Sequence, residues 1–170
     1  MANLDNPRGL VPFGEVKHVG HYKKDASAAA IFQGSPVIME DDGYIAPYSS
    51  GGGDLLGVAA KYSPASTADG DIEVYDDPNQ EFVTQDDASA TSAQTNVGNC
   101  ADCTAESGNT TTGISTCELH ITGISGSTAQ LKIKGLANTI YPTGVVNAWG
   151  AWADLIVQIN EHLYRDTAGI

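Results

Sequence analysis

Short apolar runs separated by turn residues recur along most of the chain, and this pattern predicts a protein built from β-strands. The clearest case is the pair of apolar runs at 36–39 and 44–46, which flank Asp41-Asp42-Gly43. An Asp-Gly step between two such runs predicts a β-hairpin, because glycine readily adopts the positive φ that the turn needs. Further strands are predicted at 55–62, 72–75, 81–85, 117–122, 129–134 and 153–164.

Two pairs of these predicted strands follow one another closely in the sequence. We expect 72–75 to pair with 81–85 across Asp76-Asp77-Pro78-Asn79, and 117–122 to pair with 129–134. About seven or eight short strands at this spacing are typical of all-β barrels and sandwiches. The pattern therefore predicts a mainly β, single-domain antiparallel β-barrel or sandwich.

Two segments depart from the strand pattern. Residues 1–24 contain prolines and glycines too closely spaced for a helix, and we expect an extended N-terminal arm in front of a β-rich core domain at 25–170. The apolar residues of this arm, Leu10, Val11 and Phe13, either pack on their own domain or lie across another protein. Residues 86–116 are rich in Gly, Ser and Thr, and we expect a long flap with one short helix near 88–95.

Charge excludes several classes of partner. The 170 residues include 8 Lys and Arg against 21 Asp and Glu, a net charge of −13 at pH 7. No direct contact with nucleic acid is expected, because such contacts depend on basic side chains, and an anionic membrane surface would repel the chain. The acidic stretch between Lys61 and Lys132 is either a solvated surface or a face complementary to a basic partner. The N-terminus lacks the pattern of a signal peptide, so we expect synthesis in the cytoplasm.

One spacing could hold a metal. Cys100, Cys103, Cys117 and His120 have the separations of a tetrahedral zinc site. Residues 117–122 are predicted to be strand, however, and residues three apart on a strand face opposite sides. We therefore expect no metal or other cofactor, while zinc binding and a disulfide both stay open. No catalytic motif is complete, and we expect no enzyme activity.

Three stretches carry a resemblance to a known family: Asn6-Pro7-Arg8-Gly9-Leu10-Val11-Pro12, the run Val74-Tyr75-Asp76-Asp77-Pro78-Asn79-Gln80-Glu81-Phe82, and residues 156–165. In these stretches, the chain resembles the head decoration (capsid cement) proteins of tailed bacteriophages. The similar stretches occur in the same order, and the resemblance covers nearly the whole chain. The resemblance implies a barrel-like or tulip-like β core on the outer surface of the virion, at junctions between major capsid protein subunits. It also implies head stabilisation without catalysis, and self-association as a homotrimer.

Under this hypothesis, we expect Arg8, Leu10, Val11 and Phe13 to contact the major capsid protein, with the arm adding a strand to a neighbouring sheet. One alternative is a β-sandwich glycan-binding module for host-surface attachment, with Tyr141, Trp149 and Trp152 as stacking platforms. Core or interface packing of these aromatic residues is the competing interpretation. Another alternative is a different non-enzymatic virion component, such as a tail protein.

Overall fold

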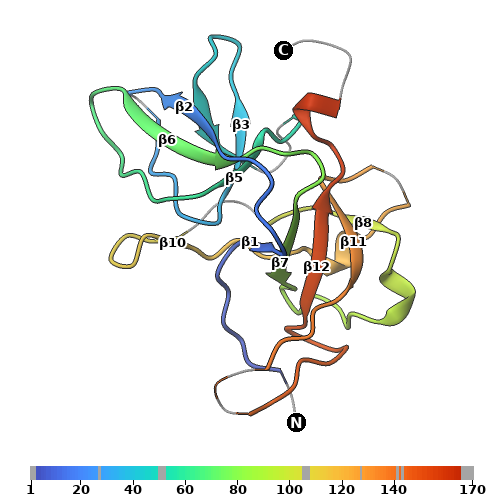
Figure 1. The fold of residues 1–170 in the computed structure, drawn as a ribbon. Helices are drawn as coiled ribbons and strands as arrows, with labels where there is room; N and C mark the ends of the chain where they lie inside the picture. The colour runs from blue at the N-terminus through green and yellow to red at the C-terminus, as the bar shows by residue number, and fades with distance from the viewer. Residues whose placement is uncertain are drawn as a thin grey trace.

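The chain folds into a closed barrel and a five-stranded sheet that lie side by side (Figure 1). The computed structural model describes residues 3–26, 28–49, 53–104, 108–126, 128–140, 142 and 144–165. Its named elements are β-strands and three short 3-10 helices. The predicted fold class, a mainly β barrel or sandwich, is confirmed.

The barrel contains five strands in the order β2-β4-β3-β5-β6, with β6 closing onto β2. The strands are β2 (Gly20–Lys24), β3 (Pro36–Met39), β4 (Ile45–Pro47), β5 (Gly57–Ala59) and β6 (Gly70–Tyr75). The predicted hairpin of β3 and β4 is confirmed, with Met39 opposite Ile45 and Gly43 at φ +84° in the turn. The barrel interior is filled by buried aliphatic side chains: Ile31, Val37, Ile45, Leu56, Ala59, Ile72 and Val74.

The second sheet is antiparallel throughout and has the order β1-β7-β12-β11-β8. Its strands are β1 (Val11–Phe13), β7 (Glu81–Gln85), β8 (Cys100–Ala101), β11 (Leu131–Leu136) and β12 (Asp154–Ile159). One face carries a larger apolar core in which Phe82, Leu131, Ile133, Leu155 and Val157 are all fully buried. The strand predicted at 153–164 is confirmed for its first half, and the chain then turns into the 3-10 helix η3 (Leu163–Arg165).

Both other predicted hairpins are wrong. Strands β6 and β7 belong to different sheets, because the turn between them carries the chain from the barrel to the five-stranded sheet. Its ends, Asp76 and Gln80, are buried and bind the segment between β1 and β2, so the turn is fixed by tertiary contacts. Residues 117–120 form only isolated bridges, followed by η2 (Ile121–Gly123), and β11 pairs with β12 and β8 instead.

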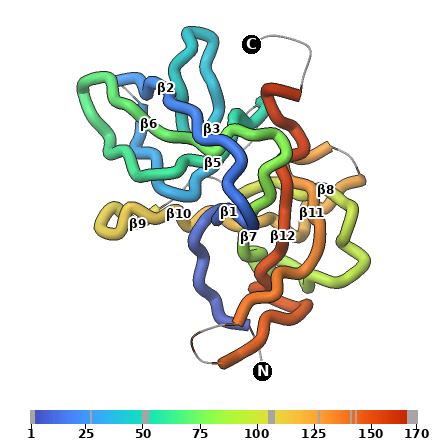
Figure 2. Tube along the Cα trace, in the orientation of Figure 1, coloured from blue at the N-terminus to red at the C-terminus, as the bar shows by residue number. Residues whose placement is uncertain are grey.

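The segments predicted as arm and flap are built into the molecule. The N-terminal segment contributes β1 to one sheet and β2 to the other (Figure 2). In place of a helix near 88–95, the structure has one 3-10 turn, η1 (Gln94–Asn96). The flap also supplies β8 and the small hairpin of β9 (Gly108–Asn109) and β10 (Ile114–Ser115). Within the described residues, no helix has the length and apolar character needed to cross a membrane.

Candidate functional site: an apolar groove beside strand β1

The N-terminal segment lies along the five-stranded sheet and is held there by polar contacts. The Asn3 side chain donates to the carbonyl oxygens of Ala148 and Ala151, at 2.7 and 3.1 Å. The Gln85 side chain accepts a hydrogen bond from the Asn6 N–H at 2.7 Å and donates to the Leu4 carbonyl at 2.8 Å. These contacts fix the segment before it reaches β1.

Two of the four residues predicted to bind the capsid are engaged within the chain. The Arg8 guanidinium forms an ion pair with Asp154 at 2.9 Å, and the Asp154 side chain is completely buried. Leu10 is 1% exposed and belongs to the larger apolar core. Leu10 is therefore not available to a partner, and Arg8 already has one inside the protein. The remaining two, Val11 and Phe13, are 39% and 42% exposed.

A close approach of two glycines sets the path of the chain just before β1. The Leu10 N–H donates to the Gly34 carbonyl at 2.9 Å. Gly9 has φ +68°, and a Cβ at this position would lie 2.5 Å from the Gly34 oxygen. Only glycine fits here without displacing the backbone of the neighbouring segment.

An apolar groove opens beside β1, where the barrel, the five-stranded sheet and the β9–β10 hairpin meet. Its volume is about 190 Å³, and it is lined by Arg8, Leu10, Val11, Pro12, Gln33, Gly34, Ala59, Tyr75 and Ile114. Ile114 on β10 is 40% exposed, and Val11 and Phe13 lie on one face of β1 because strand residues alternate. We call Val11, Phe13 and Ile114 the β1 face. Ile114 lay in the predicted flap, and its position at the groove beside β1 was not predicted.

Strand β1 is the edge of its sheet, but it is a poor template for strand addition. It is three residues long, and its central residue, Pro12, has no N–H to donate. Proline and short length are common devices that protect sheet edges from further pairing. The expected strand addition by the arm is therefore disfavoured, and the β1 face offers side chains for contact instead.

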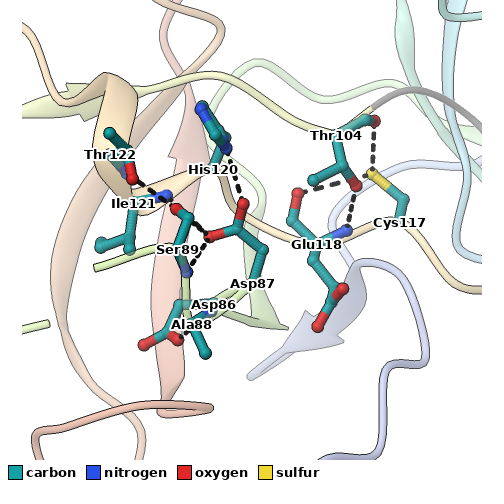
Figure 3. A network of polar contacts seen from close by, with 10 residues as sticks. All are labelled: Asp86, Asp87, Ala88, Ser89, Thr104, Cys117, Glu118, His120, Ile121 and Thr122. Atoms are coloured by element: carbon teal, nitrogen blue, oxygen red, sulfur yellow. Dashed lines mark hydrogen bonds and ion pairs between the residues drawn. The ribbon is translucent and has the colours of Figure 1, made fainter. Parts of the chain in front are cut away.

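The four residues that have the spacing of a zinc site do not converge. Cys100, Cys103 and Cys117 are buried, and the Cys117 thiol donates to the Thr104 carbonyl at 3.5 Å. His120 points to Asp87, with 2.6 Å between Nδ1 and Oδ2 (Figure 3). In the part of the chain that the structure describes, no three His, Cys, Asp or Glu side chains are grouped as metal ligands.

The polar network around Asp87 serves to tie loops together. Ser89 donates its hydroxyl proton to Asp87 at 2.6 Å and accepts from the Thr122 N–H at 3.1 Å (Figure 3). Burial raises the pKa of Asp87, but hydrogen bonds from Ser89, His120 and the backbone outweigh it and leave that pKa below its ordinary value. Because the Ser89 hydroxyl is bonded to the carboxylate and not to the imidazole, the network does not have the geometry of an activated nucleophile.

The two tryptophans proposed as glycan platforms are both half-buried. Trp149 is half-buried and packs against the larger core. Trp152 is also half-buried, and its backbone adopts φ +55° just before β12. Tyr141 lies outside the described residues. The packing of Trp149 fits the competing interpretation, in which the tryptophans belong to the core.

Comparison with known proteins identifies no relative. The chain matched no family model, no curated protein sequence and no solved structure.

Proposed function

We propose that this protein is a structural virion component, a decoration (capsid cement) protein of a tailed-phage head. It binds the outer surface of the capsid at junctions between major capsid protein subunits and stabilises the head. The observation that carries the proposal is the β1 face, three exposed apolar side chains on a rigid edge beside an apolar groove. Val11 and Ile114 line the groove, and Phe13 lies on the same face of β1 as Val11. Exposed apolar side chains beside a groove are typical of protein-binding surfaces.

The rigid setting of the β1 face suits binding between larger subunits. Val11 and Phe13 are anchored by pairing to β7, and Ile114 is anchored by a bridge to Gln33. A surface that is ordered before binding loses little conformational entropy on binding. Many copies of such a contact around a shell would brace it through avidity, even if each contact is weak.

The overall charge indicates the character of the partner surface. With a net charge of −13, the protein would dock fastest on a surface with a basic rim around an apolar centre. We expect the rate of binding to heads to fall as salt is added, while the apolar contact at the β1 face sets the rate of release.

The test uses purified heads prepared without this protein, to which the full-length chain is added back. The variants Val11→Ser and Phe13→Ser should each weaken decoration by about tenfold or more, the usual effect of losing a central apolar contact. Ile140→Ser is the matched control, because Ile140 is 68% exposed but belongs neither to β1 nor to the lining of the groove. Full decoration by both β1-face variants, or recovery of the protein with tails instead of heads, would overturn the proposal.

Removing residues 1–14 is a poor test of this contact. The deletion would also remove Leu10 from the core and leave buried Asp154 without its cation. Single substitutions at exposed positions separate binding from folding. Solution mass by light scattering tests the expected homotrimer, and a monomer at the concentrations used for decoration would contradict that part of the proposal.

A further inference from the structure

Two connections between the barrel and the five-stranded sheet, and the segment that follows the last strand, meet at one cluster of polar side chains. The first connection joins β1 to β2, the second joins β6 to β7, and the third segment, 160–165, follows β12. In Figure 2, these three segments run close together between the barrel and the five-stranded sheet, the first in blue, the second in green and the third in red. The cluster consists of His18, Tyr22, Asp76, His162 and Tyr164.

Asp76 is the centre of the cluster. Its carboxylate is 4% exposed and accepts from the Tyr22 hydroxyl at 2.5 Å. Its other oxygen lies 2.5 Å from Nδ1 of His18, whose side chain is largely exposed. The Tyr22 hydroxyl lies 2.8 Å from that of Tyr164, so one carboxylate links all three segments.

The segment 160–165 closes over the barrel beside this cluster. Leu55, which leads into β5, donates to the Glu161 carbonyl and accepts from the Leu163 N–H, both at 2.9 Å. Leu163 packs against the barrel core. Arg165 donates to the Pro78 carbonyl in the β6–β7 turn and to the Ile159 carbonyl.

His162 belongs to this segment and is 2% exposed. Its Nδ1 accepts a hydrogen bond from the Tyr164 N–H at 3.1 Å, which requires Nδ1 to carry no proton. Its Nε2 is buried near the backbone carbonyl of Asp76 without a hydrogen bond among the described residues. A second proton would therefore break the bond to Tyr164 and place a charge in a buried site.

We infer that this cluster is a pH-sensitive joint, which holds the segment 160–165 on the barrel near neutral pH and releases it in acid. The charged groups that act on His162 are Arg165 on its own segment and Asp76 and Asp77 in the β6–β7 turn. Glu161 precedes His162 in the chain and is itself influenced by Asp54 and Asp102. Asp76 and Asp77 favour the charged imidazole, whereas Arg165 disfavours it.

The two histidines respond to pH in opposite directions. Burial, with Arg165 next, lowers the pKa of His162 to about 4, so the closed state is weakened as pH falls below 6.5. The hydrogen bond to Asp76 raises the pKa of His18, so that pair is fully formed below pH 6.5 and is lost as pH rises through the raised value. The joint is therefore tightest slightly below neutral pH.

Hydrogen–deuterium exchange of the full chain tests the inference, with rates corrected for the intrinsic effect of pH. Between pH 7 and pH 5, protection of the segment 160–165 should fall roughly 20-fold, from the difference between 6.5 and about 4 in the pKa of His162. His162→Gln keeps an acceptor for the Tyr164 N–H but cannot be protonated, and it should remove most of this fall. His21→Gln is the matched control on an exposed histidine of β2 and should behave as the unmodified chain does.

An equal loss of protection in His162→Gln and the unmodified chain would overturn the inference. The ring titration of His162, followed by NMR in the unmodified protein, gives a second measurement that does not depend on the variant folding. A midpoint near 4 supports the joint, and a midpoint near 6.5 overturns it.

Discussion

The Asp86 carboxylate accepts a hydrogen bond from the Trp152 backbone N–H at 2.8 Å, across 66 residues of sequence. The same oxygen accepts from the Ala88 N–H at 3.0 Å, and the other accepts from the Ala153 N–H at 3.1 Å. Ala88 and Trp152 both adopt left-handed backbone conformations, with φ of 50° and 55°. One buried side chain thus holds two residues in conformations that cost energy for any residue except glycine.

Loss of the Asp86 carboxylate should destabilise the protein more than its size suggests. We expect Asp86→Ala to lower the free energy of unfolding by about 3 kcal/mol or more, because it leaves buried N–H groups without acceptors. Asp86→Asn keeps one acceptor oxygen and should cost less. Asp42→Ala is the control, since Asp42 makes a similar bond to the Tyr44 N–H on the surface and should cost under about 1 kcal/mol. Urea unfolding measures all three, and equal costs for Asp86→Ala and Asp42→Ala would contradict the prediction.

Arg8 and Asp154 should show a large coupling energy, because they form an ion pair with each other. Asp154 is fully buried, and its Oδ1 has no hydrogen bond among the described residues. Arg8→Met leaves this carboxylate without its cation, and we expect a loss of about 3–5 kcal/mol. Asp154→Asn should cost much less in the Arg8→Met background than in the unmodified chain. A double-mutant cycle by urea unfolding checks this, and simple additivity would rule out the coupling.

The tight approach at Gly9 predicts a large effect of one methyl group. In Gly9→Ala, the added Cβ would lie 2.5 Å from the Gly34 oxygen at an unfavourable φ, so we expect a loss of at least about 2 kcal/mol. Gly14→Ala is the matched control, because Gly14 has φ +75° but nothing within 4 Å of a Cβ. It should lose only about 1 kcal/mol, the conformational cost alone. Thermal unfolding of both variants distinguishes backbone strain from collision.

Glu118 should make stability depend on pH. Burial, followed by repulsion from Asp5, Asp87 and Asp86, raises the pKa of Glu118 to about 7 from 4.5. The charged form is therefore disfavoured in the folded state, and stability is lost as pH rises from 4.5 through 7. We expect Glu118→Gln to raise the free energy of unfolding by about 1–2 kcal/mol at pH 8, after allowance for partial exposure, and to change it little at pH 4.5. A gain of the same size at both pH values would show that the charge of Glu118 is not its cause.

Local patterns predicted the strands better than they predicted their partners. The runs at 36–39 and 44–46 form the expected hairpin, because the Asp-Gly turn between them fixes both the reversal and the register. The runs at 72–75 and 81–85 also form strands, yet Asp76 and Gln80 anchor the turn between them to the segment between β1 and β2. No local pattern indicates that a turn crosses between two sheets.

The candidate site was predicted only in part. Val11 and Phe13 were predicted to contact the capsid, and both side chains are exposed, which such a contact requires. Leu10 and Arg8 were expected beside them. In the structure, Leu10 packs into the larger core, and Arg8 forms an ion pair with the buried Asp154. Ile114 could not be placed at the site from the sequence, because its bridge partner, Gln33, lies far from it along the chain.

The sequence by itself determined the β character of this protein, the position of most strands and the absence of any helix-forming segment at the N-terminus, since these depend on residue type and short-range spacing. Only the tertiary structure decided which strands pair, which apolar residues stay at the surface, and where buried charges find partners. These choices depend on groups far apart in the chain, whose contacts form together when the barrel and the sheet close around their cores.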